Sequence, residues 1–322
     1  MMEKLIVSYA PHIRTHRTTQ RLMLDVIIAL IPSLIASIVF FGIKSLFLVL
    51  TTVASCVLFE FAWQKIFKND ITVCDLSAVV TGILLAFNMP VSAPLWMGVV
   101  GGAFAIIIVK MCFGGLGNNF VNPALAARAF LLLSWPVNMT KWTPTVFVSK
   151  AAQGGADVIT GATPLGVLKE TGKISFDYMD MFLGNISGCI GEVSTLAIVI
   201  GFIYLLVKKV ITWHVPVIYV ASVFIFAELM GENGLFYILS GGLMLGAVFM
   251  ATDYVTSPMS LKGNIIYAFC LGLLTVVIRK FGALPEGVSY SILLMNIVTP
   301  LIDNVTKNRY YGKAKKSKEA KQ

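Results

Sequence analysis

The chain has 322 residues, 57% of them hydrophobic and only 13% charged. Soluble domains carry about 25% charged residues, so too few charges remain to coat soluble domains of this length. The net charge of +9 does not indicate nucleic-acid binding, because much of it lies in the tail 307–322 with few interleaved aromatic residues. Such a tail is typical of attraction to anionic membrane lipid.

Long apolar runs recur along the chain, each long enough to cross a hydrocarbon core about 30 Å thick. We therefore predict an all-α, polytopic membrane protein with about ten transmembrane helices. In chain order the predicted spans are 22–42, 45–66, 71–91, 94–110, 119–136, 183–206, 212–230, 234–252, 262–281 and 288–305.

These spans divide the chain into a cytoplasmic N-terminal arm, a first five-helix half, an outer loop, a second five-helix half and a basic cytoplasmic tail. An odd number of spans in each half predicts two inverted repeats. Lysine and arginine concentrate on the side that holds both termini, which predicts cytoplasmic termini in a multi-pass protein of the cell inner membrane. The segments are 1–21, 22–136, 137–182, 183–306 and 307–322.

Two basic residues, Arg279 and Lys280, lie on the disfavoured outer side, and we expect them to extend toward water. Polar residues also stand beside proline within or at the ends of spans, which predicts interrupted helices in both halves. The four predicted interruptions are at 88–90, 122–123, 253–258 and 299–300.

Several redox and metal motifs are absent from the sequence. It contains no GxxxxGK[ST] loop, no HExxH and no CxxC, and its three histidines are widely scattered. The five cysteines are also far apart, and most fall in predicted spans, where a thiol usually serves as a small apolar residue. Any redox work would therefore need a bound organic cofactor.

The outer loop contains DVITGAT at residues 157–163. Thr163 is suited to cap a helix that begins at Pro164, because proline favours the first helical position. This structural interpretation agrees with a functional one, since a helix N-terminus offers free amides to a phosphate. A threonine hydroxyl there can carry a phosphoester, and the small Gly161 and Ala162 would leave it open to a modifying enzyme.

DVITGAT resembles a flavinylation motif, D-x-x-[ST]-G-A-T. Two further strings, FGGLGNNFVNPA at 113–124 and FMATDYVTSP at 249–258, complete the resemblance, although Tyr254 replaces the usual proline. Together they resemble the family of membrane proteins that includes RnfD of the Rnf ion-translocating electron-transport complex and NqrB of the sodium-pumping NADH:quinone reductase. The first span begins after about twenty residues, which favours the Rnf branch.

The resemblance implies FMN joined through its phosphate to Thr163 by a flavin transferase, with Asp157, Thr160, Gly161 and Ala162 completing the attachment motif. It also implies a complex that passes electrons between reduced ferredoxin and NAD, coupled to Na⁺ or H⁺ movement. The chain would act with the other Rnf subunits as an electron carrier without catalytic side chains of its own.

Relatives further suggest a second, non-covalent flavin, riboflavin, within the membrane. The residues we assign to flavin binding outside the loop are Gly115, Asn118, Asn122 and Arg128. Amides and a guanidinium at a span entrance are costly without partners, and an isoalloxazine ring would supply partners. The alternative is that the glycines only permit close helix packing.

Ionisable residues inside spans are candidates for an ion path. We assign this role to Asp25 and Asp253, although acids near span ends also reach water directly. Asp253 lies beside hydroxyl oxygens that suit a cation. A competing hypothesis is a small-solute transporter or channel without redox chemistry, which would have no need of the DVITGAT motif.

Overall fold

The computed structural model describes residues 18–145, 161–172, 176–282 and 286–306. All regular secondary structure within these ranges is helical, which confirms the all-α class. By length and composition, four of the described helices can cross a membrane: α1 (Thr19–Phe41), α2 (Ile43–Ile66), α14 (Leu261–Phe281) and α15 (Val288–Thr306). Five shorter apolar helices are α3 (Ser77–Phe87), α4 (Leu95–Ala103) with its continuation η2 (Phe104–Met111), α5 (Pro123–Ser134), α10 (Thr195–Val207) and α11 (His214–Leu229).

The remaining elements are short. They are η1 (Val73–Asp75), α6 (Pro136–Met139), α8 (Pro164–Thr171), α9 (Tyr178–Leu183), α12 (Gly234–Leu239), α13 (Leu243–Leu245) and η3 (Gly246–Met250). Both η2 and η3 are π-helical. Such wide turns inside a helix are frequent at functional sites.

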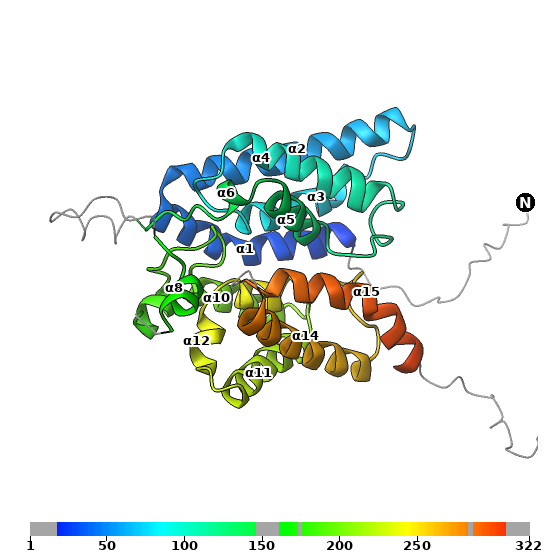
Figure 1. The fold of residues 1–322 in the computed structure, drawn as a ribbon. Coiled ribbons are helices and arrows are strands. Elements are labelled where there is room, and N and C mark those ends of the chain that lie inside the picture. Colours follow the sequence, from blue (N-terminus) through cyan, green and yellow to red (C-terminus); the bar gives the residue numbers. More distant parts are fainter. Residues whose placement is uncertain (1–17, 146–160, 173–175, 283–285, 307–322) are drawn as a thin grey trace, which may run out of the picture.

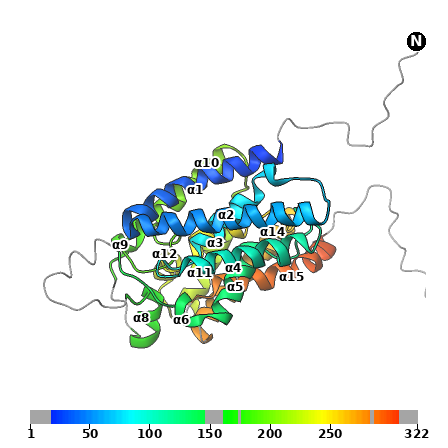
Figure 2. The same cartoon turned by 90° about the horizontal axis from the view of Figure 1, so that it is seen from above.

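The helices form two layers, with α1 to α6 in one and α10 to α15 in the other (Figure 1). Across the layers, α1 packs against α10 and α5 packs against α15. The start of α1 and the end of α15 lie at one end of the molecule, and α8 lies at the opposite end (Figures 1 and 2). The segment around Thr163 is therefore held away from the described ends of the chain.

Several predicted spans are only partly helical. The span predicted at 71–91 is helical only over α3 apart from the short η1, and the one predicted at 183–206 is interrupted until α10 begins at Thr195. The turns beside them bond to each other, because Ile190 N–H donates to Met89 O at 3.1 Å and Gly191 N–H donates to Phe87 O at 3.0 Å. This pairing satisfies backbone groups that helices would otherwise satisfy.

Three of the four predicted interruptions are present and one is wrong. α3 ends at Phe87, α5 begins at Pro123, and η3 ends at Met250 before the 253–258 segment. The prediction at 299–300 fails because α15 runs through Pro300 without a break. The Thr299 hydroxyl donates to Met295 O at 2.9 Å and to Thr256 O at 3.0 Å, so it packs inside the helix bundle.

The expected outward reach of Arg279 is also wrong. Arg279 is 4% exposed, and its guanidinium donates to Tyr237 O at 2.5 Å and Ser240 O at 3.0 Å. These carbonyls belong to the end of the short helix α12, so the arginine stays inside to satisfy groups that have no helical partner. Lys280 instead remains partly exposed and pairs with Glu232.

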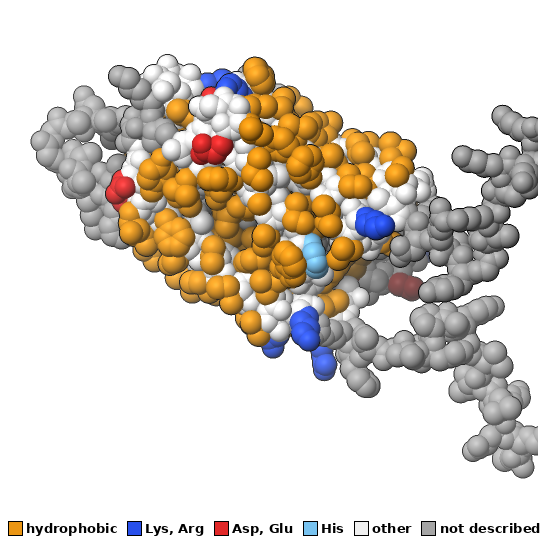
Figure 3. All heavy atoms as spheres, turned by 90° about the horizontal axis from the view of Figure 1, so that it is seen from below, with side chains coloured by type: hydrophobic (Ala, Val, Ile, Leu, Met, Phe, Trp, Pro, Cys, Tyr) orange, Lys and Arg blue, Asp and Glu red, His pale blue; other side chains and the backbone are white. Residues whose placement is uncertain are grey.

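The outer surface of the helices is strongly apolar. Figure 3 shows one face covered largely by hydrophobic side chains. Exposed apolar residues of the long and shorter apolar helices include Leu58, Ile66, Val207, Leu229, Leu301 and Val305. An apolar surface of this extent is suited to lipid and not to water.

Candidate functional site

Thr163 caps α8 as its sequence context predicts. Its Oγ1 accepts a hydrogen bond from the backbone N–H of Gly166 at 3.2 Å, and Pro164 occupies the first helical position. Because the oxygen acts as an acceptor, the hydroxyl hydrogen is not used in this bond. The side chain is 7% exposed, which is more buried than an open loop would leave it.

A cavity of about 460 Å³ lies against Thr163. Ligand pockets typically span about 300–1,000 Å³, so this cavity is large enough for an aromatic ring system. Its lining joins the α8 segment to the first half and to Glu286, two residues before α15. The lining residues are Arg128, Leu132, Met139, Thr140, Lys141, Trp142, Gly161, Ala162, Thr163, Gly166, Glu170 and Glu286.

Arg128 connects several parts of the protein at this cavity. Its guanidinium forms an ion pair with Glu286, donates to Ser289 Oγ at 2.7 Å and donates to Asn88 Oδ1 at 3.2 Å. Arg128 is 5% exposed, so the burial of its charge is compensated by the Glu286 carboxylate and by two neutral acceptors. Sequence reasoning missed Glu286, because it lies outside the predicted spans.

The structure describes only the last three residues of the attachment motif 157–163. Asp157 and Thr160 lie outside the described residues, whereas Gly161, Ala162 and Thr163 all line the cavity. A Cβ added at Gly161 would clash with the Ser187 hydroxyl. Glycine is therefore required there by close approach of the chain and not by an unusual backbone angle.

The predicted flavin-binding residues do not form one site. Asn122 lines a second, smaller cavity of about 100 Å³ together with Lys110, Asn119 and Asp253. Arg128 lies farther along α5 at the Thr163 cavity. The start and the middle of α5 thus place Asn122 and Arg128 at different cavities.

Gly115 and Asn118 line neither of these cavities. Gly115 has a φ of +87°, which L side chains rarely adopt, and Asn118 donates to Gly114 O at 3.3 Å across an exposed turn. Close helix packing does not explain Gly115 either, since a Cβ there would meet nothing within 4 Å. The positive φ therefore explains why a glycine is suited to position 115.

The two predicted ion-path acids lie in different surroundings. Asp25 accepts from the Tyr204 hydroxyl at 2.9 Å, which links α1 to α10. Asp253 lines the smaller cavity and accepts from Thr256 Oγ1 at 3.2 Å. The structure therefore does not place them in one shared cavity.

Sequence reasoning also missed an ion pair beside the smaller cavity. Lys110 Nζ lies 2.6 Å from Glu60 Oε2, and the two side chains are 3% and 1% exposed. A lysine at the end of a predicted span would instead be expected to reach water. The sequence did contain a sign of this ion pair. Glu60 lies inside an apolar predicted span, where a carboxylate needs a partner.

Comparison with known proteins identifies the relatives of this chain. The D subunit of the Na⁺-translocating ferredoxin:NAD⁺ oxidoreductase complex of Acetobacterium woodii is 53% identical over 98% of each chain. The D subunit of the proton-translocating ferredoxin:NAD⁺ oxidoreductase complex of Clostridium ljungdahlii is 42% identical over 95% of this chain and 96% of that one. The D subunit of an ion-translocating oxidoreductase complex from Escherichia coli is 35% identical over 96% and 99%.

The family described as NQR2, RnfD, RnfE matches residues 6–312, nearly the whole chain. The apolar helices of the described structure agree with a multi-pass membrane protein. The resemblance drawn from the three sequence strings is thereby confirmed: this chain belongs to the NQR2, RnfD, RnfE family.

Proposed function

We propose that this chain is the membrane subunit of an Rnf-type, ion-translocating ferredoxin:NAD oxidoreductase complex and that it carries FMN esterified to Thr163. The observation that carries the proposal is the cavity of about 460 Å³ lined by Thr163, Gly161 and Ala162. It combines a hydroxyl at a helix N-terminus with room for a ring system.

The residues around this cavity fit a phosphate-linked flavin. Lys141 supplies positive charge and Trp142 supplies an aromatic face, whereas the charge of Arg128 is compensated by Glu286. A bound flavin would supply electron-transfer chemistry, which no side chain at the cavity provides. The role of the protein here is to hold, orient and enclose the cofactor.

The small residues of the motif support access to Thr163. Gly166, which follows the motif, also leaves room at the hydroxyl, because a Cβ added there would lie 3.2 Å from Thr163 Oγ1. Ala162 is exposed and leaves the adjacent surface uncrowded. A flavin transferase, the partner that we propose for maturation, would have to approach from this side.

The relatives indicate the partners and leave the coupled ion open. The Acetobacterium woodii relative is named for a Na⁺-translocating complex, and the Clostridium ljungdahlii relative for a proton-translocating one. We propose that the other membrane and peripheral Rnf subunits are the partners of this chain. The coupled ion is Na⁺ or H⁺.

Riboflavin at the smaller cavity stays a prediction. Asn119, Asn122, Lys110 and Asp253 provide polar groups that suit the ring edges of a flavin. The cavity of about 100 Å³ is, however, smaller than typical ligand pockets of about 300–1,000 Å³. Its present size does not fit a flavin ring, so no function is assigned to it.

The arrangement of the helices supports, at coarse scale, the inverted-repeat prediction. α2 packs against α4 in the first half, and α11 packs against α14 in the second. The pairs α1 with α10 and α5 with α15 join elements at equivalent positions of the two halves, as a pseudo-two-fold axis would require.

Flavin fluorescence of the denatured chain tests the attachment. The wild type and the Thr163→Val and Thr160→Val variants would each be co-expressed with a flavin transferase and separated on a denaturing gel. We expect fluorescence in the wild type and in Thr160→Val and its complete loss in Thr163→Val, because only Thr163 offers the linking oxygen.

Two further variants separate chemistry from folding. Thr163→Ser keeps both the helix cap and the hydroxyl, whereas Thr163→Asp keeps the cap but has no hydroxyl to esterify. We expect fluorescence in the first and none in the second, with both variants folded. A dark wild-type band despite an active transferase would contradict the proposal and favour the transporter hypothesis.

A further inference from the structure

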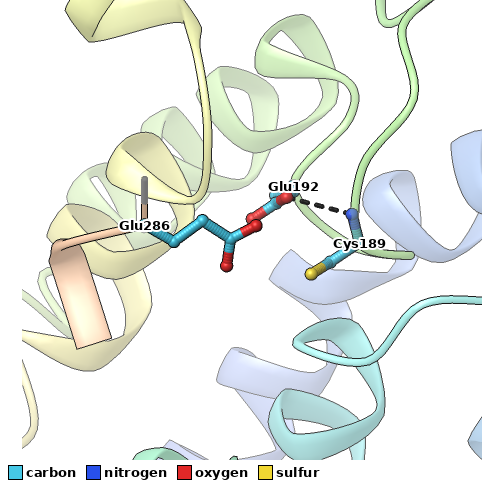
Figure 4. Close-up of side chains that lie close together, drawn as sticks. All are labelled: Cys189, Glu192 and Glu286. Atoms are coloured by element: carbon cyan, nitrogen blue, oxygen red, sulfur yellow. Dashed lines mark hydrogen bonds between the residues drawn. The ribbon is translucent and has the colours of Figure 1, made fainter. Parts of the chain in front are cut away.

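A buried cluster of three side chains lies beside the Arg128 end of the Thr163 cavity. One ligand atom each from Cys189, Glu192 and Glu286 lies within 4.8 Å of the other two. Figure 4 shows the carboxyl groups of Glu192 and Glu286 directed toward each other from two segments far apart in the sequence. The fold has thus brought together two acids that no local motif connects.

Two oxygens of this cluster have no hydrogen-bond partner among the described residues. Glu192 Oε1 accepts from the backbone N–H of Cys189 at 2.9 Å, but the buried Oε2 has no such partner, and the residue is 7% exposed. Glu286 Oε2 pairs with Arg128, and its Oε1 is likewise buried without a partner. Both free oxygens belong to the carboxyl groups that face each other.

The two buried arginines near the cluster leave these two oxygens without a hydrogen-bond donor. Arg128 compensates one of the two carboxylates. Arg279 interacts with Glu192 electrostatically, but the hydrogen bonds found for its guanidinium go to the carbonyls of Tyr237 and Ser240. Tyr290, which also acts on Arg128, is neutral. A buried carboxylate oxygen without a hydrogen-bond partner is unfavourable, and a bound cation would supply that partner.

The chemistry of the cluster selects a hard, singly charged ion. The Cys189 thiol donates its hydrogen to Asn88 O at 3.5 Å and accepts from an Arg128 nitrogen at 3.7 Å. A zinc site would need several thiolates or imidazoles. Carboxylate oxygens suit hard cations, and a divalent ion would leave excess positive charge beside Arg128.

We propose that Glu192 and Glu286 form a binding site for one monovalent cation, Na⁺ or a proton, next to the arginine that lines the Thr163 cavity. An ion about 2.4 Å from each of two oxygens can bridge a separation of up to about 4.8 Å. Gly242 lies against Glu192 Oε2, because a Cβ added at Gly242 would lie 2.8 Å from this oxygen. Cation binding at this site does not depend on the flavin, whereas its coupling to electron transfer rests on the proposed function.

Thermal unfolding of the full chain in lipid nanodiscs tests Na⁺ binding. NaCl would be titrated against choline chloride at constant ionic strength in the wild type, Glu192→Gln and Glu232→Gln. Glu232 is the control, because it pairs with Lys280 at a partly exposed site. We expect a saturable, Na⁺-specific rise in Tm in the wild type and in Glu232→Gln, and no rise in Glu192→Gln.

Infrared spectroscopy of the same samples without Na⁺ tests the proton. If the proton is the occupant, the C=O band of a protonated carboxylic acid is present in the wild type and in Glu232→Gln and is lost in Glu192→Gln. Gly242→Ala serves if Glu192→Gln does not fold, because it keeps the carboxyl group and crowds Oε2. It should weaken the Na⁺ response or shift the band.

Two results would overturn the inference. One is the absence of both the Na⁺ response and the acid band in the wild type. The other is their persistence, unchanged, in Glu192→Gln and Gly242→Ala. Neither result depends on flavin fluorescence at Thr163, so failure of the cation site and failure of the flavin proposal are distinguishable.

Discussion

At the scale of single residues, the Lys110–Glu60 pair links two helices in a nearly dry place. Lys110 on η2 also donates to Ser77 Oγ at 2.6 Å, and Glu60 on α2 accepts from Gln64 Nε2 at 3.4 Å. Each charge thus has a neutral neighbour as well as its counter-ion. Such a network is costly to break from one side, because the remaining charge stays buried.

We expect Glu60→Gln to destabilise the protein by about 3–5 kcal/mol, since it leaves Lys110 buried without a counter-ion. Thermal unfolding in detergent measures the loss. Replacing both partners, in Lys110→Met with Glu60→Leu, should recover much of the stability, because neither charge is then buried. A double variant that is less stable than Glu60→Gln would contradict this explanation.

Glu232→Gln provides the matched comparison. Glu232 lies 3.4 Å from Lys280, and both side chains are partly exposed. Exposed pairs contribute about 0–1 kcal/mol, so this variant should unfold close to the wild-type temperature. Equal losses in Glu60→Gln and Glu232→Gln would show that burial is not what distinguishes the two pairs.

At the scale of helices, the sequence predicted what depends on neighbouring residues. Thr163 before Pro164 and Asn122 before Pro123 are both helix caps, because capping needs only the next few amides. The ends of α3 and α10 were misplaced by several residues. The turns that flank them bond to each other across a long stretch of chain, and hydropathy does not report such pairing.

At the candidate site, too, the sequence predicted local features but not contacts between distant segments. The resemblance identified Thr163 as the attachment residue, and the sequence placed it at a helix N-terminus. The pairing of Arg128 with Glu286 arises only when the two halves meet, and the approach of Glu192 to Glu286 joins distant segments of the second half. Ionisable residues inside the spans were visible as candidates, but their partners were not.

Small residues allow close helix packing in both halves. A Cβ at Gly98 would lie 2.5 Å from Thr52 Oγ1, and one at Gly102 would clash with Ser55 on the same helix, α2. In the second half, a Cβ at Gly272 on α14 would clash with Ser222 on α11. Glycines spaced in this way are typical of helices that pack closely inside membranes.

Gly102→Val and Gly272→Val should therefore each destabilise the chain. Overpacking of this kind typically costs about 1–3 kcal/mol, and thermal unfolding in detergent measures it. Val99→Leu is the control, since Val99 lies on the same helix as Gly102 but is 40% exposed. If Gly272→Val unfolds like Val99→Leu, then α11 and α14 do not depend on this close contact.

At the scale of the whole molecule, the polar contacts that join the two halves lie near the candidate sites. Arg128 from the first half bonds to Glu286 and Ser289 from the second, and Tyr204 of α10 bonds to Asp25 of α1. A change of charge at the Thr163 cavity would thus act directly on a contact between halves. This is the arrangement that coupling between two sites requires, since each site can bias the same interface.

The positions of α8 and of the described chain ends predict how the protein is oriented in the membrane. α8 lies at the end opposite to the start of α1 and the end of α15 (Figure 1). The distribution of lysine and arginine predicts cytoplasmic termini, so we expect α8 and Thr163 to face outward. In a cysteine-free background, Thr171→Cys on α8 and Asn69→Cys after α2 report the two sides, and both positions are exposed.

A membrane-impermeant maleimide applied to intact bacterial cells should label Thr171→Cys at once and Asn69→Cys only after permeabilisation. The natural Cys74 and Cys112 must be absent, because both are exposed and would react. The reverse pattern would put Thr163 in the cytoplasm. It would then move the flavin proposed there, and the Glu192 cation site beside it, to the inner side of the membrane.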